Sequence, residues 1–289
     1  MKFLLIFLFV IINSFALQIT SFDNEVVNGK TALIKLEKQD GIEYKDIALG
    51  KKKFPIIHSP VNKKCCFALV PVSYYEKVSS KELYINYFDN KKEKSTLLFL
   101  NVQKGIYAHE EIHVDPSKVN PKSKEVKQRI EKEYNQAMNI YNTVTPKLYI
   151  SKPFELPLDS NITSDFGKAR VYNGSLNGYH SGTDFRAKTG TAIKASNDGK
   201  VVLVSDRFYS GGTVVVDHGY GIYTCYFHMS KFDVKKGQMV QKGELLGLSG
   251  QSGRVTGPHL HFAVRVDGVQ VDPLQLITLL NNNILKDNK

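Results

Sequence analysis

Three short stretches in the second half of the chain bring together histidine, aspartate and glycine, residue types that build zinc sites. They are His180-Ser181-Gly182-Thr183-Asp184, Tyr226-Phe227-His228 and Gly257-Pro258-His259-Leu260-His261-Phe262. In a strand, the alternation of HLHFAVRV puts His259 and His261 on one face, about 6.6 Å apart along the chain. One of them can therefore bind zinc while its neighbour reaches a metal-bound water.

The spacing of His180 and Asp184 also fits a metal site. Residues four apart converge on a helix or around a bend, and Gly182 favours the bend. Two neutral imidazoles and one carboxylate make a zinc site of net charge +1 with an open position, as a catalytic zinc requires. Strand alternation in IYTCYFHM predicts one polar face, made of Thr224, Tyr226 and His228.

A second stretch, His109-Glu110-Glu111-Ile112-His113, matches the H-E-x-x-H zinc motif. The motif works only on a helix, where one turn brings both histidines to the same face. Gly105 and Pro116 bracket this stretch, and its β-branched and aromatic residues favour a strand. In a strand the two histidines stand about 13 Å apart, too far for one ion. We expect no zinc here.

The elements that must position these residues divide the chain into a β-rich module over 17–118, a helix with a linker over 119–152, and a second β domain over 153–280, followed by a tail over 281–289. The first module contains β-type runs separated by turn residues, which predict strands at Ala32-Leu36, Phe67-Val72, Leu83-Phe88, Thr96-Val102 and Ile106-Val114. This spacing favours a small all-β sandwich. The second domain is rich in glycine, with strands predicted at Ile162-Phe166, Val201-Ser205, Thr213-Asp217, Ile222-His228 and His259-Val266.

Between the two domains, Asn120-Pro121 reads as a helix start, and the next apolar residues recur in steps of three and four up to Val144. This pattern predicts an amphipathic helix that ends before Pro146 and packs on a domain. A short closing helix is predicted over Asp272-Asn281, and the tail after it is expected to fray.

The first sixteen residues indicate export. Lys2 precedes an apolar run from Phe3 to Ile12, and Ser14-Phe15-Ala16 resembles a cleavage site. The run is too short to span a bilayer comfortably, and no later stretch reaches eighteen apolar residues. We expect a signal peptide over 1–16, a periplasmic location, and no integral membrane segment after cleavage.

Composition and charge limit the class of protein and the kinds of partner that it could bind. With 42% hydrophobic and 23% charged residues, neither wholesale disorder nor a polytopic membrane protein is plausible. The net charge of +11 suits an anionic partner, and export removes intracellular nucleic acid from consideration. The three cysteines make no disulfide framework: Cys65 and Cys66 are adjacent and cannot readily bridge each other, and nothing in the spacing demands a bond from either of them to Cys225. The oligomeric state is not specified, and a monomer is the expectation.

With these residues in place, the segment from about Asn161 to Leu276 resembles the LytM/lysostaphin family of zinc peptidases, which cut peptidoglycan cross-bridges and stem peptides. The landmarks occur in family order: Ser164-Asp165-Phe166-Gly167, His180 with Asp184, Ala195 through Val201, His218-Gly219, Tyr226 through His228, Gly237 through Gly243, and Gly257 through Phe262. Thr183 departs from the aliphatic residue usual in the family. The insert between Phe166 and His180, with Arg170 and Tyr172, resembles the version in cell-shape-determining peptidases of helical Gram-negative bacteria.

This resemblance implies a mostly β protein with a LytM-type antiparallel domain and an open groove. It implies His180, Asp184 and His261 as zinc ligands, and His228 and His259 as catalytic histidines. Zinc lowers the pKa of bound water to about 7. Either histidine can take the proton from this water while the other steadies the oxyanion or protonates the leaving amine, and the sequence does not assign the roles.

The expected function is therefore that of an exported zinc-dependent peptidoglycan hydrolase, an endopeptidase, a carboxypeptidase or both. The alternatives are a non-catalytic LytM-like module that binds the cell wall or activates an amidase, and a biotinyl/lipoyl-type carrier domain, which export and the histidines disfavour. The upstream region over 17–150 is expected either to offer a side chain to the open zinc position, and so mask the groove, or to target the enzyme to the wall.

Overall fold

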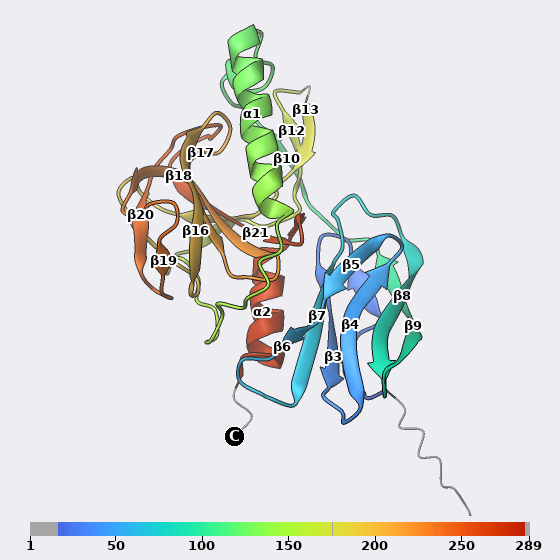
Figure 1. Cartoon of the computed structure of the whole chain (residues 1–289). Helices are drawn as coiled ribbons and strands as arrows, with labels where there is room; N and C mark the ends of the chain where they lie inside the picture. Colours follow the sequence, from blue (N-terminus) through green and yellow to red (C-terminus); the bar gives the residue numbers. More distant parts are fainter. Residues whose placement is uncertain (1–16, 175, 287–289) are drawn as a thin grey trace, which may run out of the picture.

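The computed structural model describes residues 17–174 and 176–286, and the predicted signal peptide lies outside them. Figure 1 shows two β-rich halves, with one helix lying against the C-terminal half and projecting beyond it, and a second helix between the halves. The chain is mostly β, as expected. In the part of the chain that the structure describes, no helix is long and apolar enough to cross a membrane.

The N-terminal half is a sandwich of two sheets. One sheet has the order β1-β3-β7-β6, with β1 at Ile19–Phe22, β3 at Thr31–Glu37, β7 at Cys65–Pro71 and β6 at Ile57–His58. The other has the order β2-β9-β8-β4-β5, with β2 at Glu25–Val27, β9 at Lys92–Gln103, β8 at Ser79–Asp89, β4 at Ile42–Leu49 and β5 at Lys52–Pro55. Ile34, Ile47 and Leu83 are fully buried in the core that the two sheets share.

The C-terminal half is built on one large sheet with the path β11-β14-β21-β18-β17-β16-β19. These strands span Ile162–Ser164 (β11), Thr183–Arg186 (β14), His259–Val266 (β21), Ile222–Phe232 (β18), Gly211–Asp217 (β17), Gly199–Arg207 (β16) and Met239–Val240 (β19). Three further strands pair beside this path: β15 (Ala192–Lys194), β20 (Leu245–Ser249) and β22 (Val269–Val271). Phe185, Tyr226 and Phe262 are fully buried and anchor its core.

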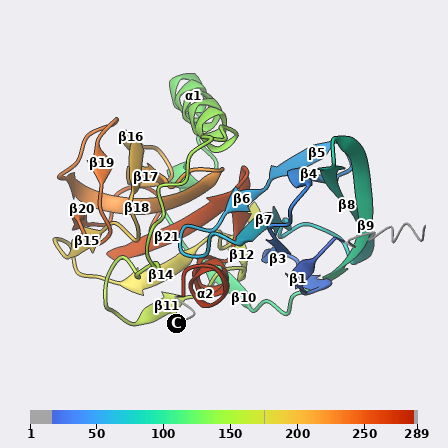
Figure 2. The ribbon, with the colours of Figure 1, turned by 60° about the horizontal axis from the view of Figure 1, so that its bottom comes forward.

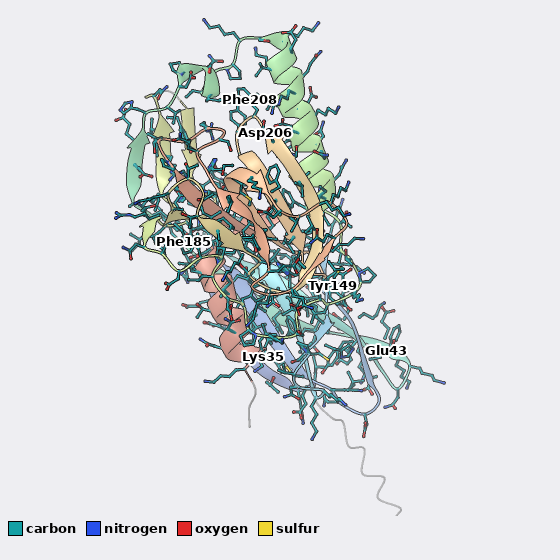
Figure 3. All side chains as sticks on the ribbon, turned by 90° about the vertical axis from the view of Figure 1, so that its left-hand side faces the viewer. Lys35, Glu43, Tyr149, Phe185, Asp206 and Phe208 are labelled. Atoms are coloured by element: carbon teal, nitrogen blue, oxygen red, sulfur yellow. The ribbon has the colours of Figure 1, made fainter. Side chains whose placement is uncertain are left out.

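Helix α1, Lys124–Tyr141, covers one face of this sheet. It begins later than the sequence predicts: the N-cap is Ser123, whose side chain accepts a hydrogen bond from Val126 N, so Asn120-Pro121 lies before the helix. At its end, Tyr141 is buried against Tyr223 with ring centroids 5.8 Å apart. In Figure 3, Asp206 and Phe208 lie at the tip of the β16–β17 hairpin beside this helix. There Arg129 of α1 pairs with Asp206 at 3.3 Å.

Helix α2, Pro273–Asn283, joins the two halves. Figure 2 shows it nearly end-on between them. Its buried side chains share one core with N-terminal residues such as Leu33 and Phe67, and Gln275 exchanges hydrogen bonds with the backbone of Thr31. The expected fraying after Asn281 is wrong for the next residues, because Ile284 and Leu285 are buried in the same core.

A third, three-stranded sheet makes a second link between the halves. Strand β10, His109–Ile112, runs parallel to β12, Ala169–Tyr172, which pairs with β13, Leu176–Tyr179. The sequence did not predict β12 or β13, because their residues lie in the insert before His180 and show no clear alternation. These strands form the wall beside the site described next.

Candidate metal centre

Two paired strands bring a histidine and an aspartate together. Asp184 on β14 lies directly opposite His261 on β21, and His180 stands just before β14. Asp184 Oδ1 lies 2.9 Å from His180 Nε2 and 2.8 Å from His261 Nδ1, and these two nitrogens are 2.9 Å apart. Three donor atoms from three points of the chain therefore converge on one spot.

Gly182 makes this approach possible. A Cβ at this position would lie 2.4 Å from Phe262 O and 2.6 Å from His261 Nε2, distances that a side chain does not tolerate. The bend between His180 and Asp184 thus needs a residue without a side chain. This agrees with the bend predicted from the sequence.

The three residues fit a zinc ion. All three are buried, and they form the group of potential ligands found in the described part of the chain. Tetrahedral zinc with bonds of about 2.0–2.1 Å separates its donors by about 3.3 Å, close to the spacing here. Two imidazoles and a carboxylate leave a fourth position open, as in catalytic zinc sites.

The protonation states favour cation binding. Burial by itself would raise the pKa of Asp184, but the close contacts of its carboxylate with His180 and His261 outweigh burial and hold this pKa far below its usual range. Burial lowers the pKa of His261 to about 4, so its imidazole is neutral at neutral pH. A neutral imidazole and an ionised carboxylate are the forms that ligate metals.

Hydrogen bonds outside this trio fix its orientation. His180 Nδ1 lies 2.7 Å from the carbonyl of Asp165, which can only accept, so Nδ1 donates and Nε2 is free to ligate. Arg170 of β12 donates to Asp184 Oδ2 at 3.3 Å and to Ser164 Oγ at 3.1 Å. Glu110 of β10 holds the same guanidinium at 3.0 Å.

Two further histidines flank the trio. His259 Nε2 lies 3.6 Å from Asp184 Oδ1, and the rings of His228 and His259 are 4.8 Å apart. Each donates its Nδ1 proton to a backbone carbonyl at 2.8 Å, His228 to Ser252 and His259 to Gly257. Their Nε2 atoms therefore lack a proton in the neutral form and can accept one. Burial, followed by the neighbouring histidines, lowers the pKa of His228 well below its usual value.

The predicted strand face of His228 is wrong. Strand β18 has a β-bulge at this point, because two of its residues, Phe227 and His228, oppose the single residue Thr213 of β17. His228 has a φ of +63°. The bulge turns His228 away from the Tyr226 face and toward His261, at a ring distance of 5.9 Å, while Phe227 stacks on His261 at 5.4 Å. Simple alternation cannot reveal such an insertion.

The H-E-x-x-H stretch is a strand, as predicted. His109 and His113 are exposed, and neither belongs to the group of potential ligands in the described residues. Glu110 is the residue of this stretch that reaches the site, through Arg170.

The trio opens into a pocket of about 170 Å³ whose described lining comes from residues 170–261. The expectation that residues 17–150 offer a side chain to the open position is not supported. The upstream region packs beside the site instead, with Tyr74 stacked on Tyr179 at 4.0 Å and Tyr107 against Phe166. Tyr209 and Arg254 also line the pocket, and sequence reasoning missed them because neither belongs to a ligand motif.

The fold and site define a protein with a mononuclear metal centre of the catalytic-zinc type. Residues 178–273 match the sequence profile of Peptidase family M23. Over 122 residues the chain is 43% identical to the peptidoglycan DD-endopeptidase ShyA of Vibrio cholerae, covering 41% of this chain and 28% of ShyA. The chain thus spans little more than a quarter of that relative's length.

Two solved structures are also similar to this chain. The catalytic domain of the prophage-encoded M23 protein EnpA of Enterococcus faecalis is 34% identical, with 42% of this chain and 95% of that one covered and a TM-score of 0.36. A crystal structure from Pseudomonas aeruginosa, described as an M23 peptidase, is 28% identical and covers 87% of this chain and 94% of its own, with a TM-score of 0.66. The chain belongs to peptidase family M23.

Proposed function

We propose that this protein is an exported zinc-dependent peptidoglycan hydrolase. In this proposal His180, Asp184 and His261 hold the zinc ion, and His228 and His259 are catalytic. The observation that carries the proposal is the pair of unligated imidazoles beside an intact ligand trio, with each Nδ1 already committed to a carbonyl. A module that only binds the wall has no need of this pair.

Zinc, when bound, polarises the scissile carbonyl and lowers the pKa of water. The protein's own groups do the rest. His259 Nε2 lies 3.6 Å from Asp184 Oδ1, and the His228 ring lies 5.9 Å from the His261 ring. Both Nε2 atoms lack a proton in the neutral form, so one can take a proton from the attacking water. The other, once protonated, can donate to the oxyanion or to the leaving amine. Buried Asp184, held by Arg170, keeps its charge throughout.

The proposed substrate is the peptide part of peptidoglycan, either cross-links or stem peptides. It is supported by the family assignment, by the DD-endopeptidase activity of the relative ShyA and by the net charge of +11, which suits carboxylate-rich wall peptides. The apolar run after Lys2 supports export, with the periplasm as the proposed location and a monomer as the proposed state.

The insert with Arg170 and Tyr172 supports a role in setting cell shape, which deletion of the gene and microscopy of the cells would test.

Digestion of purified sacculi followed by mass spectrometry of the muropeptides tests the proposal. The expected result is loss of cross-linked dimers, of pentapeptides or of both, abolished by a chelator and restored by zinc. An unchanged muropeptide profile from zinc-loaded, folded protein would contradict hydrolysis and favour the non-catalytic module.

A further inference from the structure

Arg254 stands in the loop between β20 and β21 with its guanidinium between two tyrosine rings. The centre of the guanidinium lies 4.3 Å from the ring of Tyr172 and 4.7 Å from that of Tyr209. Arginine stacks well on aromatic faces, and stacking leaves the N–H donors at the edge of the plane free. The two rings therefore fix the orientation of this cation without neutralising it.

The pocket contains a second arginine, which provides a comparison. Arg170 is committed to the carboxylates of Glu110 and Asp184. Arg254 pairs with no carboxylate among the residues that the structure describes, although it is partly buried and lines the same pocket as His180, His228 and His261. An unpaired positive charge in a concave, partly buried site attracts anions and favours the binding of an anionic group there.

The backbone around Arg254 is fixed as firmly as its side chain. Arg254 N donates to Tyr209 O at 2.8 Å, and Ser252, two residues earlier, supplies the carbonyl that holds His228 Nδ1. Gly253 has a φ of +84°, and a Cβ there would lie 2.5 Å from Tyr209 O, so the loop seats tightly on the β16–β17 hairpin. One loop thus positions both a histidine beside the metal trio and the free cation.

Arg254 also lies where the pocket continues into a larger groove. It lines a larger groove of about 760 Å³ that runs between the sheet and α1, together with Tyr209 and Phe227, which line both spaces. A peptide that lies across the metal trio and continues along this groove passes Arg254.

We propose that Arg254 binds a carboxylate of the substrate peptide, so that the enzyme selects peptides with an anionic group close to the scissile bond. This inference rests on the proposed function and adds to it a residue that determines specificity. A guanidinium edge presents two parallel N–H donors to a carboxylate, whereas a carboxamide can accept through one oxygen only and carries no charge. Wall peptides offer two sources of this group, the C-terminal carboxylate and an internal side-chain or α-carboxylate.

Three synthetic peptides separate the sources: one with all carboxylates free, one with the C-terminal carboxylate amidated, and one with the internal carboxylate amidated. For the zinc-loaded wild type, amidation of the recognised carboxylate should lower kcat/KM about tenfold or more, mainly through KM. In Arg254→Gln the same amidation should have no effect, and Arg254→Lys, which keeps the charge but not the planar fork, should show an intermediate preference.

Lys236→Gln is the matched control, since it removes one positive charge from an exposed turn outside both linings. It should keep the wild-type preference, and loss of preference here would assign the effect to overall charge and overturn the inference. An equal fall of kcat/KM in Arg254→Gln for the acid and both amides would also overturn it, because this is the signature of a merely structural arginine.

Calorimetric titration of the same peptides keeps the two proposals apart. If the wild type cleaves none of the peptides, the proposed function fails. Binding can still support the carboxylate site through a tenfold or larger preference for the free acid that Arg254→Gln abolishes. Equal binding of acid and amides by the wild type would overturn the inference whatever the outcome for cleavage.

Discussion

Arg170 and Asp184 meet at 3.3 Å, through the aspartate oxygen that faces away from the two histidine ligands. The other oxygen, Oδ1, points at His180 and His261. Arg170 therefore fixes which carboxylate oxygen is offered to a cation, and Glu110 in turn fixes Arg170. Partners of this kind orient a ligand without touching the metal.

Arg170→Gln should weaken zinc binding by about 10–100-fold, the usual effect of removing such a partner. Competition with a chromophoric chelator measures this affinity. Glu110→Gln should cause a smaller loss in the same direction, because Arg170 keeps its contacts to Asp184 and Ser164. Zinc affinity unchanged in Arg170→Gln would show that the carboxylate needs no such support.

His228→Ala and His259→Ala should lower turnover without lowering the zinc content of the protein. Both residues lie beside the trio without belonging to it, so the variants should keep one zinc per chain. Loss of a positioned acid or base typically lowers turnover about 10²–10⁴-fold. Elemental analysis and steady-state kinetics on a soluble muropeptide measure the two effects. A variant that retained full turnover would have no part in proton transfer.

His218 gives the fold a sensitivity to acid. It is fully buried, its Nδ1 donates to Asp198 O at 2.7 Å, and its Nε2 accepts from Thr224 Oγ1 at 2.8 Å. Burial lowers the pKa of His218 to about 4. The unfolded chain therefore takes up this proton near pH 6.5 while the folded chain resists it, so stability is lost as the pH falls from about 6.5 toward 4.

The loss attributable to His218 should reach at most about 3 kcal/mol, because its pKa is about 4 in the folded chain and 6.5 in the unfolded chain. Urea denaturation of the wild type and of His218→Gln at pH 7 and pH 4.5 measures it. The variant should be less stable at pH 7 and lose less stability on acidification. Parallel pH dependence in both proteins would assign the acid sensitivity to other groups.

Much of the fold could be predicted from the sequence, but not all of the site. Runs such as Phe67–Val72 alternate or are wholly apolar, and they form strands. The types and spacing of the residues predicted a site of two histidines and Asp184, and the family resemblance selected His180 and His261 as the two histidines. The orientation of His228 was missed because a β-bulge changes the face on which a residue lies without changing the alternation seen in the sequence. Arg254 was missed because its orientation depends on stacking against Tyr172 and Tyr209, which are distant from it in the chain.

A chain that starts near Ser151 should fold poorly. It would lack Leu33 and Phe67, which share a core with α2, and Tyr141, which packs on Tyr223. Its melting temperature should fall by several degrees or more. It should gain no activity on soluble muropeptides, because the described lining of the pocket contains no upstream residue. A stable and more active truncated chain would restore the masking hypothesis.

Zinc titration of metal-free protein, with release of soluble muropeptides from sacculi as the readout, tests the central claim most directly. Activity of the wild type should rise linearly and saturate at one zinc per chain. His261→Ala should stay inactive at that ratio, whereas His109→Ala, a histidine of the exposed strand, should follow the wild type. Full activity of His261→Ala at one zinc per chain, or loss of activity in His109→Ala, would contradict the assignment of the zinc site to His180, Asp184 and His261.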